Sequence, residues 1–151
     1  MPFHNPFKPL SLYQSMDVHY MRLAIEEAKH SKFPYGCILV KDNKIIATGK
    51  SGNDFDPTAH AEINAIRLAC KNLKTIDLEG TTLYATCEPC PMCFSAAWLA
   101  HIERIVYGTS LDESPFEEIN ISVDYLNKKS GNKIQITGGV LREEVLKLYK
   151  K

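Results

Sequence analysis

Residues 81–101 read TTLYATCEPCPMCFSAAWLAH and decide the fold. The apolar character of residues 81–85 predicts a buried strand, and the residues from Pro91 to His101 predict a helix. Between them, Cys90-Pro91-Met92-Cys93 places two thiols within a single turn at the start of that helix. Because two thiolates at this spacing can hold one zinc ion, the segment predicts a metal site where a strand meets a helix.

A third candidate ligand, His60, opens another predicted helix with the sequence His60-Ala61-Glu62. The sequence offers no evident fourth ligand nearby, and three protein ligands plus water are typical of a catalytic zinc rather than a structural one. Glu62 lies about 200° from His60 around an ideal helix, but at the first turn both side chains can bend toward one ion. We therefore expect one Zn²⁺ per subunit, held by His60, Cys90 and Cys93. An uncoordinated Glu62 would be the catalytic residue that moves protons between water and a leaving amine.

The rest of the chain alternates predicted helices and strands. Apolar spacing predicts helices over 16–30, 59–73, 122–131 and 140–149, with Asp17 near the start of the first and Ser122 capping the third. Apolar runs and turn residues predict a hairpin over 36–49 and strands over 104–107 and 133–136, with a loop over 108–120. This alternation predicts an α/β fold, a three-layer α/β/α sandwich around a central mixed five-stranded sheet. Residues 1–14, which contain three prolines, predict an N-terminal extended arm, and residues 15–151 a single zinc-dependent domain.

Composition narrows the classes of protein. The 151 residues are 44% hydrophobic and 24% charged, which is typical of one globular domain. Eighteen Lys and Arg balance eighteen Asp and Glu, which excludes a strongly basic nucleic-acid coat protein. No apolar run reaches the roughly 18–20 residues of a membrane span, and no signal peptide is evident, so we expect a cytoplasmic protein with no membrane partner. Three of the five cysteines fall within residues 87–93, which favours metal binding over a disulfide framework.

These residues also carry a family resemblance. His60-Ala61-Glu62 followed by Pro89-Cys90-x-x-Cys93 resembles the signature of the zinc-dependent cytidine-deaminase superfamily. The stretches DPTAHAE at 56–62 and CEPCPMC at 87–93 are most similar to those of bacterial guanine deaminases, and transfer-RNA adenosine deaminases share the first and a close variant of the second. The resemblance covers about residues 15–150 and implies the same zinc ligands, the same role for Glu62 and a homodimer.

The resemblance also implies residues that contact the substrate. An Asn upstream of the zinc-binding His often reads the purine in this family; Ser51 stands at the expected position, and Asn53 is the nearest candidate. Guanine deaminases use an acidic residue after the strand that ends at Gly108, and here Asp112, or alternatively Glu113, would take that role. Ala61 is also expected to contact the substrate, and Glu88 would help to bring a backbone N–H toward the leaving group.

The choice of substrate depends on charge. Residues 101–124 contain six acidic side chains and a single Arg or Lys, and such a loop would repel an RNA backbone. The Lys-Thr-Gly and Gly-Ser stretch and the aromatic-basic ending typical of the transfer-RNA enzymes are also missing. The main hypothesis is therefore deamination of a free nucleobase, a small molecule, with guanine converted to xanthine and ammonia; cytosine and triazines fit the same chemistry.

Two alternatives stay open. One is a transfer-RNA adenosine-to-inosine deaminase acting at the anticodon wobble position, with the seven Lys and Arg of residues 125–151, against two acids, in contact with phosphates. The other is a binding module that uses zinc for stability, against which the presence of Glu62 argues. A redox pair at Cys90 and Cys93 is a further interpretation of the motif, but it leaves His60-x-Glu62 without a role. Aromatic residues that could stack a base are Phe55, Phe116 and Tyr125.

Overall fold

The structure, a computed structural model, describes residues 10–52 and 55–150 and is built around one five-stranded sheet. The strands are β1 (Gly36–Lys41), β2 (Lys44–Lys50), β3 (Thr82–Cys87), β4 (Arg104–Thr109) and β5 (Gln135–Thr137). Their order across the sheet is β2-β1-β3-β4-β5; β1 runs antiparallel to both β2 and β3, whereas β3, β4 and β5 are parallel. The predicted mixed five-stranded sheet is confirmed.

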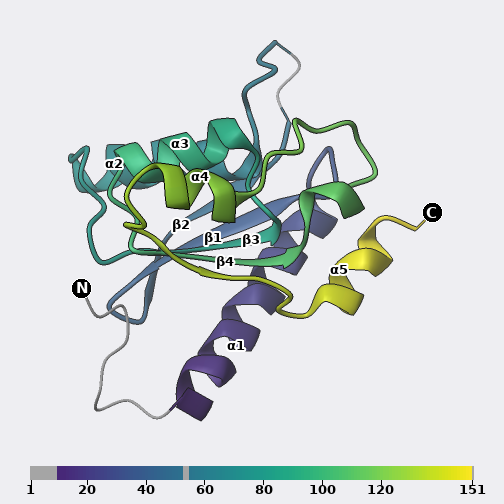
Figure 1. Cartoon of the computed structure of the whole chain (residues 1–151), viewed down its shortest axis with the longest axis horizontal. Helices are drawn as coiled ribbons and strands as arrows, with labels where there is room; N and C mark the ends of the chain where they lie inside the picture. The colour runs from purple at the N-terminus through teal and green to yellow at the C-terminus, as the bar shows by residue number, and fades with distance from the viewer. Residues whose placement is uncertain (1–9, 53–54, 151) are drawn as a thin grey trace.

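Helices cover both faces of the sheet (Figure 1). The helices are α1 (Leu10–Lys29), α2 (Ala61–Leu73), α3 (Pro91–Leu99), α4 (Val123–Lys129) and α5 (Arg142–Leu148), with a 3₁₀ turn, η1 (Leu111–Glu113), after β4. Helices α2, α3 and α4 lie on one face, and α1 and α5 lie on the other. This arrangement confirms the predicted three-layer α/β/α sandwich. No helix in the described ranges is long and apolar enough to cross a membrane.

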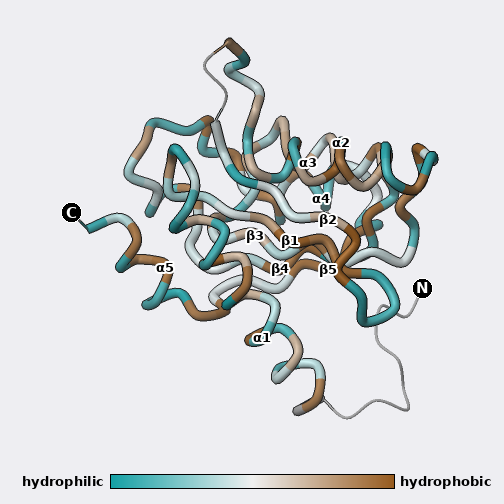
Figure 2. The backbone as a smooth tube through the Cα atoms, turned by 180° about the vertical axis from the view of Figure 1, so that it is seen from behind, coloured by the Kyte–Doolittle hydropathy of each residue, from teal (hydrophilic) through white to brown (hydrophobic). Residues whose placement is uncertain are grey.

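Successive residues of a strand point to opposite faces of the sheet, and helices cover both faces. Both sets of side chains are therefore apolar. In β3, Leu83 packs toward α2 and α3, whereas the next residue, Tyr84, packs toward α1. Ile105 and Val106 of β4 divide in the same way, and all four side chains are at most 2% exposed. Figure 2 shows the hydrophobic stretches of β1 and β4 lying between the helix layers.

Two glycines let helices approach the sheet closely. A Cβ atom at Gly36 would lie 2.2 Å from the carbonyl oxygen of Ala24 in α1. A Cβ atom at Gly49 would lie 2.0 Å from the carbonyl oxygen of Ala61, the first residue of α2. Both distances are far below any real contact, so no side chain is accommodated at either position. Gly49 therefore sets where the N-terminus of α2 lies against β2.

The N-terminal helix differs from the sequence prediction. Helix α1 begins at Leu10, so residues 10–14 of the expected extended arm are helical; residues 1–9 lie outside the described residues. Residues 10–14 contain neither proline nor glycine, so nothing in this stretch interrupts a helix. Asp17 is consequently not near the helix start. It is buried within α1 and pairs with Arg104 of β4 at 2.9 Å.

Candidate active site

Three predicted metal ligands meet at the ends of two helices. His60 is the N-cap of α2 and Cys90 is the N-cap of α3, while Cys93 lies in the first turn of α3. The Nδ1 atom of His60 lies 3.6 Å from Sγ of Cys90 and 3.5 Å from Sγ of Cys93. All three ligand atoms lie within 4.8 Å of one another. The structure thus brings together residues 30 positions apart because α2 and α3 begin at the same edge of the sheet.

These distances fit a zinc ion. A tetrahedral zinc with bonds of about 2.3 Å to sulfur and about 2.05 Å to nitrogen separates those two atoms by about 3.6 Å. The observed nitrogen–sulfur distances match this value. Among the residues that the structure describes, these three form the cluster suited to a metal, and no fourth protein ligand joins them. The donor set is therefore that of a catalytic zinc with one position open to water.

The surroundings shift the pKa values of the two thiols in opposite directions. Hydrogen bonds from Cys93 and from His60 lower the pKa of Cys90 to about 4, although partial burial opposes them. The pKa of Cys93 is raised well above its usual range, first because Cys93 shares its hydrogen with Cys90 and then because it is buried. A zinc ion bound between the two sulfur atoms would hold both of them as thiolates.

Glu62 lies beside the three ligands without joining them. It is the second residue of α2 and is 7% exposed. Burial, and then the negative charge of Cys90, raise the pKa of Glu62 to about 7. A carboxyl group with such a pKa can accept and donate a proton near neutral pH, as general acid–base catalysis requires. The catalytic role of Glu62 stays a prediction, which its burial and raised pKa favour.

A cavity of about 650 Å³ opens over these residues. Its walls come from the segment before β1, the loop between β2 and α2, the end of β3 and the loop between β4 and α4. The lining residues include Lys32, Phe33, Tyr35, Ser51, Phe55, His60, Ala61, Glu62, Cys87, Glu88, Cys90, Phe116, Glu117 and Glu118. The cavity lies at the carboxyl ends of the parallel strands β3 and β4, where open α/β sheets commonly bind ligands.

The predicted substrate-binding residues differ in where they lie relative to the cavity. Ala61 and Glu88 line the cavity, but both carboxylate oxygens of Glu88 accept hydrogen bonds from the protein backbone. Ser51 also lines it, and its hydroxyl donates to the carbonyl of Phe33 at 2.8 Å. Asn53 lies outside the described residues. The assignment of roles to these residues stays a prediction.

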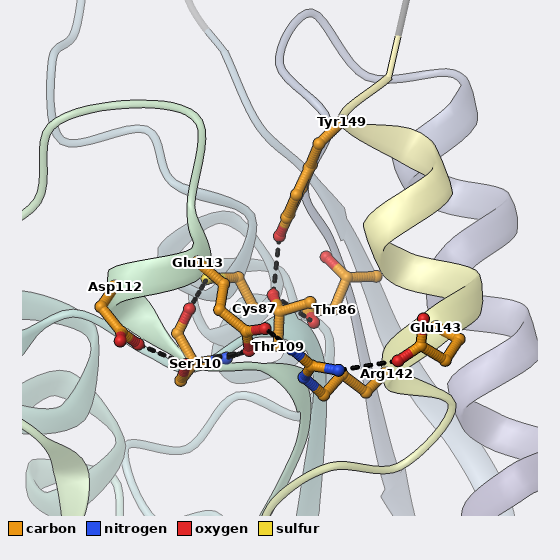
Figure 3. A network of polar contacts seen from close by, with 9 residues as sticks. All are labelled: Thr86, Cys87, Thr109, Ser110, Asp112, Glu113, Arg142, Glu143 and Tyr149. Atoms are coloured by element: carbon orange, nitrogen blue, oxygen red, sulfur yellow. Dashed lines mark hydrogen bonds and ion pairs between the residues drawn. The ribbon is translucent and has the colours of Figure 1, made fainter.

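Asp112 does not line the cavity. Figure 3 shows Asp112 and Glu113 in a network of polar contacts at the start of the loop after β4. The hydroxyl of Ser110 donates to Asp112, and Glu113 pairs with Arg142 at the beginning of α5. The acidic residues that do line the cavity are Glu117 and Glu118, farther along the same loop.

The sequence analysis missed one wall of the cavity. Phe33 and Phe116 pack edge to face with ring centroids 5.3 Å apart, and Tyr35 contacts Phe116 at 6.2 Å. Phe116 was among the candidate aromatic residues, but Phe33 and Tyr35 were not, because they meet it only in the folded chain. Burial raises the pKa of Tyr35, whose hydroxyl is hydrogen-bonded to Ser114.

Comparison with known proteins identifies the family. Residues 14–109 match the cytidine and deoxycytidylate deaminase zinc-binding region. The tRNA-specific adenosine deaminase of Buchnera aphidicola subsp. Schizaphis graminum is 37% identical over 141 residues, which are 87% of this chain and 90% of that protein. A structure solved in a study of A-to-I editing by deaminases at the wobble position of transfer RNA is 32% identical, covers 86% of this chain and 98% of its own, and has a TM-score of 0.73. The chain therefore belongs to the cytidine and deoxycytidylate deaminase family, and its cofactor is zinc.

The prediction of guanine as the substrate is wrong. The guanine deaminase of Bacillus subtilis is 43% identical over only 90 residues, which are 56% of this chain and 58% of that protein. The match to the transfer-RNA enzyme extends over most of both chains, so the alternative interpretation is the better supported one. The acidic count that favoured a free base over RNA was misleading, because only Glu117 and Glu118 of the six acids in residues 101–124 line the cavity. Glu113 is paired with Arg142 instead.

Proposed function

We propose that this chain is a transfer-RNA adenosine deaminase that converts adenosine to inosine at the anticodon wobble position. The observation that carries the proposal is the extent of similarity to a tRNA-specific adenosine deaminase, which spans 87% of this chain and so reaches beyond the matched zinc-binding region. A base within RNA must leave its stack to reach the zinc site, so the cavity must admit a whole nucleotide.

The cavity has features that suit an unstacked nucleotide. Its volume of about 650 Å³ lies within the usual range of about 300–1,000 Å³ for ligand sites. Phe33 and Phe116 are 40% and 47% exposed and present apolar rings at its wall. Single-stranded RNA is commonly bound by stacking bases on aromatic side chains. Lys32 also lines the cavity and brings a cation to it, with its Nζ 5.9 Å from the centre of the Phe33 ring.

The residues of the site support hydrolytic deamination. His60, Cys90 and Cys93 would hold zinc, which when bound lowers the pKa of a coordinated water to about 7. Water adds across the C6–N1 double bond of adenine, and Glu62 passes the proton taken from this water to N1. Glu62 then takes the remaining proton of the added hydroxyl and delivers it to the amino nitrogen, so that the bond from C6 to this nitrogen breaks, ammonia leaves, the 6-oxo base of inosine forms and the carboxylate is regenerated.

Glu62 is suited to this exchange by its position. It lies two residues after His60 at the first turn of α2 and is held away from bulk water, which keeps its pKa close to neutral. The positive end of the α2 dipole favours negative charge at this point. The same carboxyl can therefore be a base in the first step and an acid in the second.

The proposal is tested with the purified, zinc-loaded protein and an anticodon stem-loop carrying adenosine at the wobble position. We expect inosine at that position together with an equal amount of ammonia. The control is the same stem-loop with guanosine there, and free adenine, guanine and cytosine are assayed in parallel. Turnover of a free base with an inert stem-loop would contradict the proposal. Full zinc content with RNA binding and no ammonia from any substrate would support the binding-module alternative instead.

Two further expectations belong to this proposal. The first is a homodimer, which the family resemblance implies and which size-exclusion chromatography with light scattering would test. The second is a cytoplasmic location, which suits an enzyme that acts on transfer RNA and which cell fractionation would test.

A further inference from the structure

Glu88 connects the zinc motif to the loop that covers the cavity. It precedes Pro89-Cys90 directly, and it is 5% exposed. Its Oε1 atom accepts a hydrogen bond from the backbone N–H of Leu111 at 3.2 Å, and its Oε2 atom accepts one from the N–H of Val123 at 2.8 Å. Leu111 and Val123 are the two ends of the segment between β4 and α4, which is defined here as the covering loop, residues 111–123.

The middle of the covering loop forms part of the cavity wall. Phe116, Glu117 and Glu118 line the cavity, although the ends of the loop lie at Glu88. Two other lining residues contact the same loop: Tyr35 is hydrogen-bonded to Ser114, and Phe33 packs against Phe116. The position of these lining residues relative to the zinc ligands therefore depends on how the loop ends are held.

We propose that Glu88 is a positioning residue that fixes the covering loop relative to Cys90 and so places the loop's side chains against the substrate. One carboxylate holds both ends of the loop, and it lies two residues before the zinc ligand Cys90. The proposal concerns the same site as the proposed function and depends on it only for the substrate used in the kinetic assay.

The backbone N–H groups of Leu111 and Val123 require a hydrogen-bond acceptor. Leu111 begins η1 and Val123 begins α4, and the first N–H groups of a helix have no acceptor within it. Both residues are buried, at 3% and 0% exposure, so water does not replace a lost partner. Glu88 satisfies two such groups at once, which explains why a carboxylate is buried here.

Glu88 is itself held firmly by its backbone. Its N–H donates to the carbonyl of Thr109, the last residue of β4, at 2.7 Å. The side chain is therefore attached to the sheet on one side and to the loop on the other. A movement of the loop ends would require these charge-assisted hydrogen bonds to break, which keeps the loop in a single position.

The test uses Glu88→Gln, which has nearly the same shape but a single acceptor oxygen. The amide can accept from only one loop end, and we expect it to retain the shorter bond, to Val123. Amide hydrogen exchange, measured by NMR, should then accelerate at Leu111 by about 10- to 100-fold, which corresponds to the loss of one hydrogen bond to a charged group. With the stem-loop substrate, KM should rise by about tenfold or more while kcat and zinc content stay unchanged.

Two variants serve as controls. Asp17→Asn removes another buried carboxylate, which pairs with Arg104 and accepts from Tyr84 away from the cavity. It should lower the melting temperature without changing KM or the exchange of Leu111. Glu88→Asp keeps both acceptor oxygens on a shorter side chain and should restore part of the protection; it replaces Glu88→Gln in the exchange measurement if the amide variant does not fold.

Three results would overturn the proposal. The first is a Glu88→Gln variant whose amide hydrogen exchange at Leu111 and Val123 equals that of the wild type. The second is a Glu88→Gln variant that loses zinc but keeps the wild-type exchange rates. The third is a rise in KM that is equal in Asp17→Asn and Glu88→Gln. If the wild-type protein does not deaminate the stem-loop, the proposed function fails, yet the exchange measurement still decides the role of Glu88.

Discussion

Replacing Gly49 by alanine tests how the sheet positions the metal site. Gly49 is buried in β2, opposite Cys37 of β1. The added Cβ would lie 2.0 Å from the carbonyl oxygen of Ala61 and 2.9 Å from Cβ of Ala65, whereas ordinary contact begins at 3.4 Å. The first turn of α2 would have to recede by about 1.4 Å, the difference between 2.0 and 3.4 Å.

This displacement acts on stability and on the metal site together. Overpacking of a tight interior costs about 1–3 kcal/mol, and we expect the upper end because the contact is with rigid backbone. For a domain of this size, about 3 kcal/mol corresponds to a fall in melting temperature of about 6–12 °C. His60 directly precedes Ala61, and zinc bonds tolerate only about ±0.2 Å, so zinc affinity should fall as well. A misplacement of about 1 Å can cost about 100-fold in rate.

The assay combines thermal unfolding, bound zinc per chain and the rate of ammonia release. The control is Gly139→Ala, because a Cβ at Gly139 meets nothing within 4 Å. The backbone φ of Gly139 is +80°, so that variant should lose only about 1–2 kcal/mol through strain and keep its zinc. A Gly49→Ala protein with the wild-type melting temperature, zinc content and rate would refute the account of how α2 is positioned.

Three further predictions concern single residues. Glu62→Gln should keep its zinc, measured by elemental analysis, and lose at least about 100-fold in ammonia release; normal turnover would remove Glu62 as the proton carrier. Cys90→Ala and Cys93→Ala should each lose zinc and activity, and full zinc occupancy in either variant would remove that residue from the ligand set. Asp17→Asn should leave Arg104 buried without its partner and lower the free energy of unfolding by about 3–5 kcal/mol in a denaturant titration; a change below about 1 kcal/mol would show that the ion pair does not stabilise the fold.

The parts of the site that sequence reasoning predicted are those encoded locally. His60 and Glu62 lie two residues apart at one helix start, and Cys90 and Cys93 lie within the first turn of another, so spacing alone indicated their chemistry. Their meeting follows from the alternation of strands and helices, which also predicted the sheet. The hairpin over residues 36–49 was equally local and matches β1 and β2 closely.

The parts that could not be predicted depend on contacts between distant segments. The covering loop has no regular pattern, and its course is set by Glu88, Tyr35 and Arg142, which lie elsewhere in the chain. For this reason the sequence pointed to Asp112, or alternatively Glu113, whereas the acids of this loop that line the cavity are Glu117 and Glu118. The substrate error has the same origin, because a count of charges along the chain does not say which side chains face the cavity.

The central claim is that the zinc site acts on an adenosine in transfer RNA. The most direct measurement is to incubate the zinc-loaded protein with a full-length unmodified transfer RNA carrying adenosine at the wobble position and to map inosine by sequencing. We predict inosine at the wobble position alone, and none with Glu62→Gln at equal zinc content. The absence of inosine from a wild-type sample that is fully zinc-loaded would contradict the claim.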